Sequence, residues 1–78
     1  MTVIKIGMSG PNVCDLQQML NLKVAEPPLL KVDGIFGPKT KARVVKFQAG
    51  NRLVADGIVG PLTGKALVAA VLVATLQP

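Results

Sequence analysis

The stretch VDGIFGPKTKA, residues 32–42, recurs 23 positions later as ADGIVGPLTGKA, residues 55–66. Both copies contain the pattern Asp-Gly-Ile-(Phe/Val)-Gly-Pro-x-Thr. Two copies of so short a unit are too few to build a solenoid. The repeat is therefore either a duplicated ligand loop or a device used twice to begin a helix.

The residue types in the repeat favour a helix start. Asp-Gly is a strong turn signal, because glycine adopts positive φ without steric cost. The Ile or Val that follows is expected to point inward as a plug, after which Gly-Pro begins a helix with Thr in its first turn. The aspartate is expected to accept hydrogen bonds from N–H groups at the helix start or within its own turn. We therefore assign structural roles to Asp33, Gly34, Phe36, Gly37, Thr40, Asp56, Gly57, Gly60 and Thr63.

Chemical interpretations of the repeat are weaker. Asp33 and Asp56 could form a pair of catalytic carboxylates, but equivalent positions in a repeat predict equivalent environments, whereas an acid and a base need different ones. Neither Gly-x-Gly-x-x-Gly nor the Gly-Lys-Ser/Thr signature of a phosphate loop is present. With no histidine and only Cys14, a zinc or iron site has almost no ligands. We expect no enzyme activity and no cofactor, and interpret Cys14 as a small buried hydrophobe.

Helical periodicity predicts an all-α fold, a single small domain of three helices over residues 1–78. The helices are expected at residues 11–22, 38–49 (ending at Gly50-Asn51) and 61 to about 74. The inward stripes are expected to consist of Val13, Leu16, Met19 and Leu20, and of Thr40, Val44 and Phe47. Three residues of the first connection are expected to fold back onto the core: Leu29, Leu30 and Val32. Leu53 and Val54 are expected to be the apolar anchors of the second connection.

The net charge of +5 comes from nine lysines and arginines against four acidic residues. It favours anionic partners such as nucleic acid, an anionic cell-wall polymer or a lipid surface. At about 100° per residue, Lys39, Arg43 and Lys46 form one basic stripe on the second helix. The stripe is either a ligand-binding surface for carboxylates and phosphates or a plain solvated face. We expect no nucleic-acid partner, because no exposed aromatic side chain is available for stacking and the motifs of nucleic-acid readers are absent.

The third helix is unusual because no charged residue follows Lys65. Its apolar residues point in nearly every direction around the axis: Leu67, Val68, Val71, Leu72, Val73 and Leu76. We therefore expect it to contact a second copy or a parent chain, unless its last turn frays and folds back over the core. The apolar run from Ala66 to Leu76 has 11 residues, whereas a membrane span needs about 20.

The first ten residues, MTVIKIGMSG, contain no apolar run long enough for a signal peptide. Four localisations therefore stay open: the cytoplasm, association with a phage, export by another route, or a secreted wall protein of which this chain is a fragment.

Three segments together resemble the peptidoglycan-binding domain 1 family. GMSGPNVCDLQQML is similar to its opening Gly-x-x-Gly-x-x-Val-x-x-Leu-Gln-x-x-Leu pattern, and DGIFGPKTKARVVKFQ and NRLVADGIVGPLTGKAL are similar to its central and closing motifs. The resemblance runs from Gly7 to about Leu67, in the family's order and spacing. At Arg43 the chain has a cation where the family usually has alanine.

The resemblance implies a compact three-helix domain in which two pseudo-repeated units pack together. It also implies a non-catalytic module that anchors cell-wall hydrolases to peptidoglycan. The alternative is a protein-interaction or regulatory module that keeps this fold without binding the wall.

Overall fold

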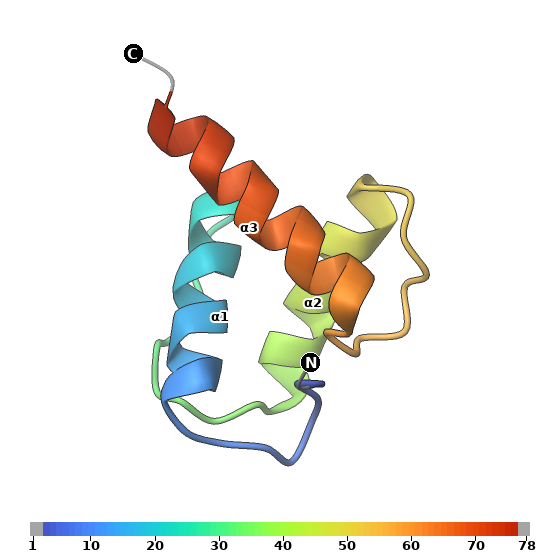
Figure 1. Cartoon of the computed structure of the whole chain (residues 1–78). Coiled ribbons are helices and arrows are strands. Elements are labelled where there is room, and N and C mark those ends of the chain that lie inside the picture. The colour runs from blue at the N-terminus through green and yellow to red at the C-terminus, as the bar shows by residue number, and fades with distance from the viewer. Residues whose placement is uncertain (1–2, 77–78) are drawn as a thin grey trace.

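Three helices form the regular structure of the chain, with α1 at Pro11–Lys23, α2 at Pro38–Gly50 and α3 at Pro61–Leu76 (Figure 1). The computed structural model describes the backbone of residues 3–76 and the side chains of residues 3–70. Within residues 3–76 there are no strands, only two isolated antiparallel bridges. The predicted all-α fold is confirmed, and each helix begins at the expected proline and ends one or two residues later than expected.

Each helix begins in the same way, because its first proline follows a glycine, at Gly10, Gly37 and Gly60. The carbonyl of each glycine accepts a hydrogen bond from an N–H in the first turn, at 2.8–3.2 Å. Proline suits the first position because the N–H that it lacks would have no partner within the helix. The repeated Gly-Pro pair is therefore a helix start, as predicted.

The end of α2 differs from the prediction. The helix continues through Gly50, and the residue with positive φ is Arg52, at 59°. Asn51 donates its side-chain amide to the carbonyl of Phe47 at 2.8 Å. This bond satisfies one of the carbonyls that the helix end leaves without a partner.

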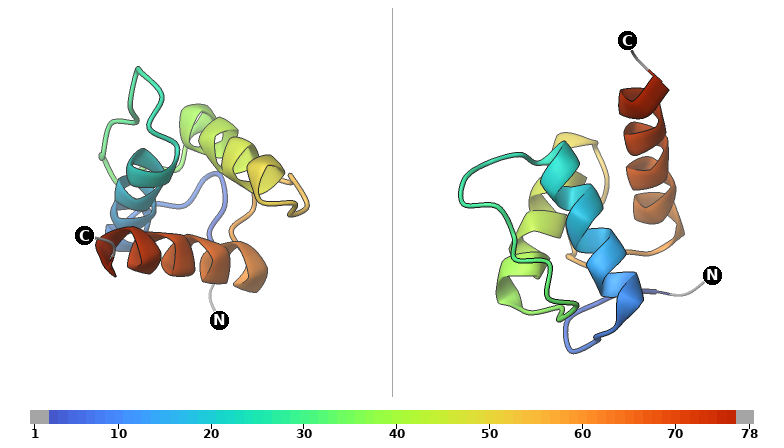
Figure 2. Two further views of the ribbon diagram at one scale, coloured as in Figure 1. Left: turned by 90° about the horizontal axis from the view of Figure 1, so that it is seen from above. Right: turned by 90° about the vertical axis from the view of Figure 1, so that its left-hand side faces the viewer.

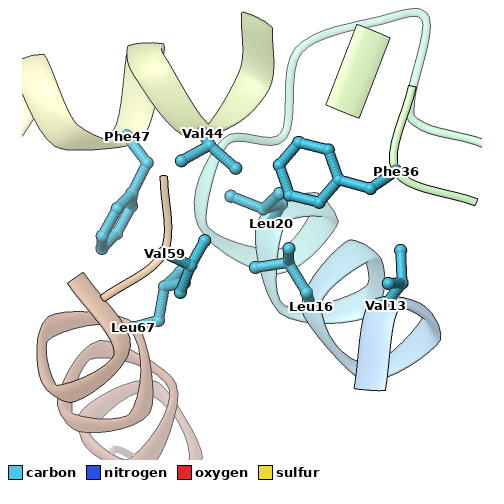
Figure 3. Packing of buried hydrophobic residues seen from close by; sticks show 8 residues of the cluster. All are labelled: Val13, Leu16, Leu20, Phe36, Val44, Phe47, Val59 and Leu67. Atoms are coloured by element: carbon cyan, nitrogen blue, oxygen red, sulfur yellow. The ribbon is translucent and has the colours of Figure 1, made fainter. Parts of the chain in front are cut away.

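The core consists of eight apolar side chains that pack together (Figure 3). Three come from α1 (Val13, Leu16 and Leu20), two from α2 (Val44 and Phe47) and one from α3 (Leu67), and Phe36 and Val59 lie in the turns just before α2 and α3. Helix α1 packs against both α2 and α3. In Figure 2, α3 lies along one side of the molecule, with α1 and α2 on the other. The predicted stripes of α1 and α2 are confirmed, with Met19 partly buried beside the core.

The loops contribute less to the core than predicted. Leu30 and Leu53 pack against it. Leu29 and Val32 are 57% and 41% exposed, and Val54 is 79% exposed. The predictions that Leu29 and Val32 fold back onto the core and that Val54 is an apolar anchor are wrong, and the hydrogen bonds described below hold the loops instead.

The segment before α1 joins the two repeats. Ile4 exchanges two backbone hydrogen bonds with Val59, at 2.8 and 3.0 Å. Four residues later, Met8 accepts a hydrogen bond from Phe36 N–H at 2.9 Å, and the N–H of Gly10 donates to the carbonyl of Gly34 at 2.9 Å. The N-terminal segment therefore pairs with both Asp-Gly turns.

The exposed apolar surface of α3 is only partly described. Leu67 is buried, whereas Val68 is 49% exposed and Leu62 is 73% exposed. The other residues of the predicted contact surface, Val71, Leu72, Val73 and Leu76, lie outside the described side chains. Within the described part of the chain, every helix is too short or too polar to span a membrane.

Candidate functional site

A buried glutamine organises the first Asp-Gly turn. Gln17 of α1 donates from Nε2 to Asp33 Oδ1 at 3.0 Å, to the carbonyl of Ile35 at 3.1 Å and to Thr40 Oγ1 at 3.1 Å. Its Oε1 accepts a hydrogen bond from Gly34 N–H at 3.0 Å. One side chain thus ties α1 to the turn and to the first turn of α2. We call these five residues the first glutamine cluster.

The second turn repeats this arrangement with Gln48 of α2. Its Nε2 donates to Asp56 Oδ1, to the carbonyl of Ile58 and to Thr63 Oγ1, at 2.9–3.0 Å. Its Oε1 accepts from Gly57 N–H at 2.9 Å. These five residues form the second glutamine cluster, which ties α2 to the start of α3.

The two clusters explain why the chain contains the same turn twice. Both glutamines are 1% exposed and both threonines are 3–5% exposed. Burying polar groups is costly unless they are hydrogen-bonded, and no buried side-chain nitrogen or oxygen in the described part of the chain lacks a partner. The repeat is therefore a structural device, and the structural roles assigned to its Asp, Gly and Thr residues fit these contacts.

The prediction of an inward plug is wrong for both isoleucines of the turns and right for Val59. The isoleucines that follow the Asp-Gly pairs, Ile35 and Ile58, are 60% and 39% exposed, whereas Phe36 and Val59 are buried. Each isoleucine N–H donates at 2.9 Å to the aspartate two residues earlier, within the turn and not at the helix start. The isoleucine side chain therefore lies outside the core, and the next residue is part of it.

The turn glycines have the positive φ that was predicted, 76° at Gly34 and 74° at Gly57. A Cβ at Gly34 would lie 2.9 Å from Cys14 Sγ and 3.3 Å from the carbonyl oxygen of Gly10. A Cβ at Gly57 would meet only the flexible side chain of Lys41, at 2.7 Å. The first turn is therefore the more tightly enclosed of the two.

The two aspartates have similar electrostatic environments, with the charge of Lys31 as an additional, smaller influence that lowers the pKa of Asp33. The isoleucine N–H and then the glutamine amide stabilise the carboxylate of Asp33 and lower its pKa, and the same pair of contacts lowers the pKa of Asp56. Hydrogen bonds to a charged group favour its charged form. Both carboxylates are therefore held ionised by the same kind of contact.

A groove of about 660 Å³ lies between the loop before the first turn and the N-terminal half of α2. It borders the first glutamine cluster, and the second cluster has no part in it. The residues that form its walls are mostly aliphatic or basic: Pro28, Leu29, Leu30, Lys31, Ile35, Pro38, Lys39, Ala42 and Arg43. Known ligand pockets have about this volume and mostly apolar walls.

Two side chains hold the loop that forms one wall of the groove. The Arg43 guanidinium donates to the carbonyls of Val24, Glu26 and Pro28 at 2.9–3.1 Å. Asn21 of α1 exchanges two hydrogen bonds with the backbone of Leu30, at 2.8 and 2.9 Å. Arg43 thus has a structural role in this chain, holding residues 24–28 against α2.

The three cations of the predicted basic stripe have different surroundings. Lys46 forms an ion pair with Glu26, which lowers the pKa of that carboxyl, and it lies at a smaller hollow of about 310 Å³ beside Lys23. Lys39 is exposed at the groove, and among the described residues it has no hydrogen-bond or ion-pair partner. Of these three cations, Lys39 and Arg43 reach the groove and Lys46 does not, and the guanidinium of Arg43 is already engaged by backbone carbonyls.

The glutamines are the functional residues of the fold that sequence reasoning missed. Gln17 follows Val13 by four positions and precedes Leu20 by three, and Gln48 follows Val44 by four. This spacing places both glutamines within the apolar stripes of their helices. A glutamine inside an apolar stripe, followed by Asp-Gly, was the signal that could have identified them. The described residues contain no group of three metal-ligating side chains.

The sequence of this chain also matches known proteins. Residues 9–67 match the family described as "Putative peptidoglycan binding domain". The chain is 48% identical over 61 residues to the zinc D-Ala-D-Ala carboxypeptidase of Streptomyces albus G, covering 73% of this chain and 22% of that protein.

Two solved structures have the same fold. The SleB N-terminal domain superposes with a TM-score of 0.79 at 39% identity, covering 88% of this chain and 92% of that one. The endolysin of Burkholderia phage AP3 gives a TM-score of 0.78 at 38% identity, covering 90% of this chain and 26% of that one. The chain spans about a fifth of the length of the curated relatives that it matches. Because the matched residues 9–67 include all three helix starts, this chain belongs to the peptidoglycan-binding domain family.

Proposed function

We propose that this chain is a non-catalytic peptidoglycan-binding module that holds an associated activity on the bacterial cell wall. The observation that carries the proposal is the family match over residues 9–67, which includes both glutamine clusters. The similar regions of a carboxypeptidase and a phage endolysin, each a small part of a longer protein, support the role of an attached module.

The state of the two aspartates supports a module without catalysis. A general acid needs a raised pKa and its partner base a different environment. Asp33 and Asp56 have lowered pKa values from the same two kinds of hydrogen bond. Each carboxylate also holds its own turn together, so it is committed to the fold.

We further propose that Lys39, Arg43 and Lys46 contribute to wall binding in different ways. Lys39 is available to an anionic ligand at the groove. Arg43 acts by holding the groove wall, and Lys46 by neutralising Glu26, whose carboxylate would otherwise repel an anion.

Sedimentation with purified, insoluble peptidoglycan sacculi tests the proposed function. The 78-residue chain should pellet with the sacculi in a saturable way, and binding should weaken as salt rises, because exposed charges are screened. Lys39→Gln should bind less well than Lys65→Gln, which removes the same charge from exposed α3. A wild-type chain that stays in the supernatant at low salt would refute the proposal.

A further inference from the structure

We propose that the groove binds the carboxylate end of a short aliphatic peptide of peptidoglycan, with Lys39 as the anion contact and Arg43 as the residue that positions the wall. This inference rests on the proposed function and names the part of the polymer that is recognised.

The walls of the groove favour aliphatic groups. Leu29 and Ile35 are 57% and 60% exposed although both are large and apolar, and both line the groove. Because both side chains point outward, they do not contribute to the packing of the core, but their methyl groups are accessible to a ligand. Burying such surface contributes about 25 cal/mol per Å², so both side chains can contribute to binding an aliphatic group.

The polar groups beside the groove are poorly suited to a sugar. Gln17 and Thr40 border it, but the glutamine amide is fully engaged within the first glutamine cluster and also holds the threonine hydroxyl. Both aromatic residues of the chain, Phe36 and Phe47, are buried in the core. A saccharide has many hydroxyls, each of which needs a partner when it loses water. The groove therefore suits an alkyl-bearing peptide better than a glycan chain.

The charges select an anionic group on that peptide. Lys31 and Lys39 line the groove, and neither has an ion-pair partner among the described residues. Asp33 is the one acidic side chain of the described lining, and its carboxylate already accepts hydrogen bonds from Gln17 and Ile35. A net positive groove with aliphatic walls matches the free carboxylate of a peptide with small aliphatic side chains. A phosphate on a hydroxyl-rich wall polymer would match the charge but not the walls.

Arg43 keeps the peptide-facing wall in place before the ligand arrives. Its three hydrogen bonds fix the carbonyls of residues 24, 26 and 28, directly before the wall residue Leu29. A site that is already ordered loses less entropy on binding. Arg43 is therefore a positioning residue, because its guanidinium is hydrogen-bonded to the loop. Lys39 is the residue that contacts the ligand.

The test measures binding of a synthetic N-acetylated trialanine peptide, whose single charge is its free C-terminal carboxylate, by NMR titration of the 78-residue chain. The same peptide with a C-terminal amide should bind about tenfold more weakly, because a charge-assisted hydrogen bond is lost. Lys39→Gln should lose about the same factor toward the acid, and Lys65→Gln should not. Sacculi stripped of their peptides by an amidase should no longer pellet the chain.

Equal affinity for acid and amide, or undiminished pelleting with stripped glycan, would overturn this inference. Either result leaves the proposed function intact if untreated sacculi still pellet the chain, so the two failures are distinguishable. Arg43→Met should keep the helical circular dichroism, speed amide exchange in residues 24–30 and weaken peptide binding. Arg52→Met, at an exposed arginine outside the groove, should change none of these. Wild-type affinity and exchange in Arg43→Met would remove the positioning role.

Discussion

Replacing Gln17 with methionine tests whether the first glutamine cluster holds the fold together. Methionine has a similar length and can occupy the same space, but it neither donates to Thr40 nor accepts strongly from Gly34. The oxygen atoms of Asp33 and Ile35 that accept hydrogen bonds from Gln17 belong to exposed residues, so they can accept hydrogen bonds from water instead. The buried Gly34 N–H and the buried Thr40 hydroxyl cannot do so as easily.

The expected loss follows from those two buried groups. Each buried polar group left without a partner costs about 1–3 kcal/mol, so the variant should lose about 2–6 kcal/mol of unfolding free energy. At about 0.05–0.15 kcal/mol per residue, a chain of 78 residues has about 4–12 kcal/mol in total. The substitution should therefore remove a large part of the stability, and the same reasoning applies to Gln48→Met.

Chemical denaturation followed by circular dichroism measures this loss. The neighbouring Gln18 is exposed, and Gln18→Met makes the same chemical change at the surface of the same helix. That control should stay within about 0.5 kcal/mol of the wild type. If Gln17→Met and Gln18→Met unfold at the same denaturant concentration, the cluster does not stabilise the fold and the reasoning is refuted.

Three further predictions concern the turns and the third helix. Gly34→Ala should lower the melting temperature more than Gly57→Ala, because both strain a positive φ but only the first also crowds a backbone carbonyl; an equal loss would contradict this order. Folding lowers the pKa of Asp33 and Asp56, so the stability they add is present above the unfolded-state pKa near 4 and is lost as the pH falls through the lower folded values. Denaturation of wild type beside the double aspartate-to-asparagine variant should show the difference in unfolding free energy shrinking below about pH 4, and a difference that does not change with pH would argue against it. If α3 contacts a second copy, light scattering should show a concentration-dependent mass that Val68→Lys abolishes; a wild type that stays monomeric at high concentration would rule this out.

The sequence predicted the helices and the turns well because both depend on local chemistry. Gly-Pro begins each helix, and glycine at positive φ forms each turn, wherever the rest of the chain lies. The partners of Arg43 were not predictable in the same way. Helical spacing correctly places it beside Lys39 on α2, but its hydrogen bonds depend on the path of residues 24–28, which no periodicity encodes. The sequence therefore predicted that the three cations share one face of α2, but it did not predict that each has different contacts.

Helix α2 contributes to both glutamine clusters, but only the first cluster borders the groove, so the two clusters should affect stability and binding differently. Its first turn belongs to the first cluster through Thr40, and its last turn belongs to the second through Gln48, so neither repeat has a complete set of contacts without the helix that they share. The groove, however, borders only the first cluster. Damage to the second cluster should thus reduce the folded fraction and leave the affinity of the folded molecules unchanged. Damage to the first should reduce both, because Gln17 holds the turn from which Ile35 projects into the groove. At a temperature where Gln48→Met is still folded, its peptide affinity should match the wild type, whereas that of folded Gln17→Met should not. Equal affinities in the two folded variants would mean that the groove does not depend on the turn beside it.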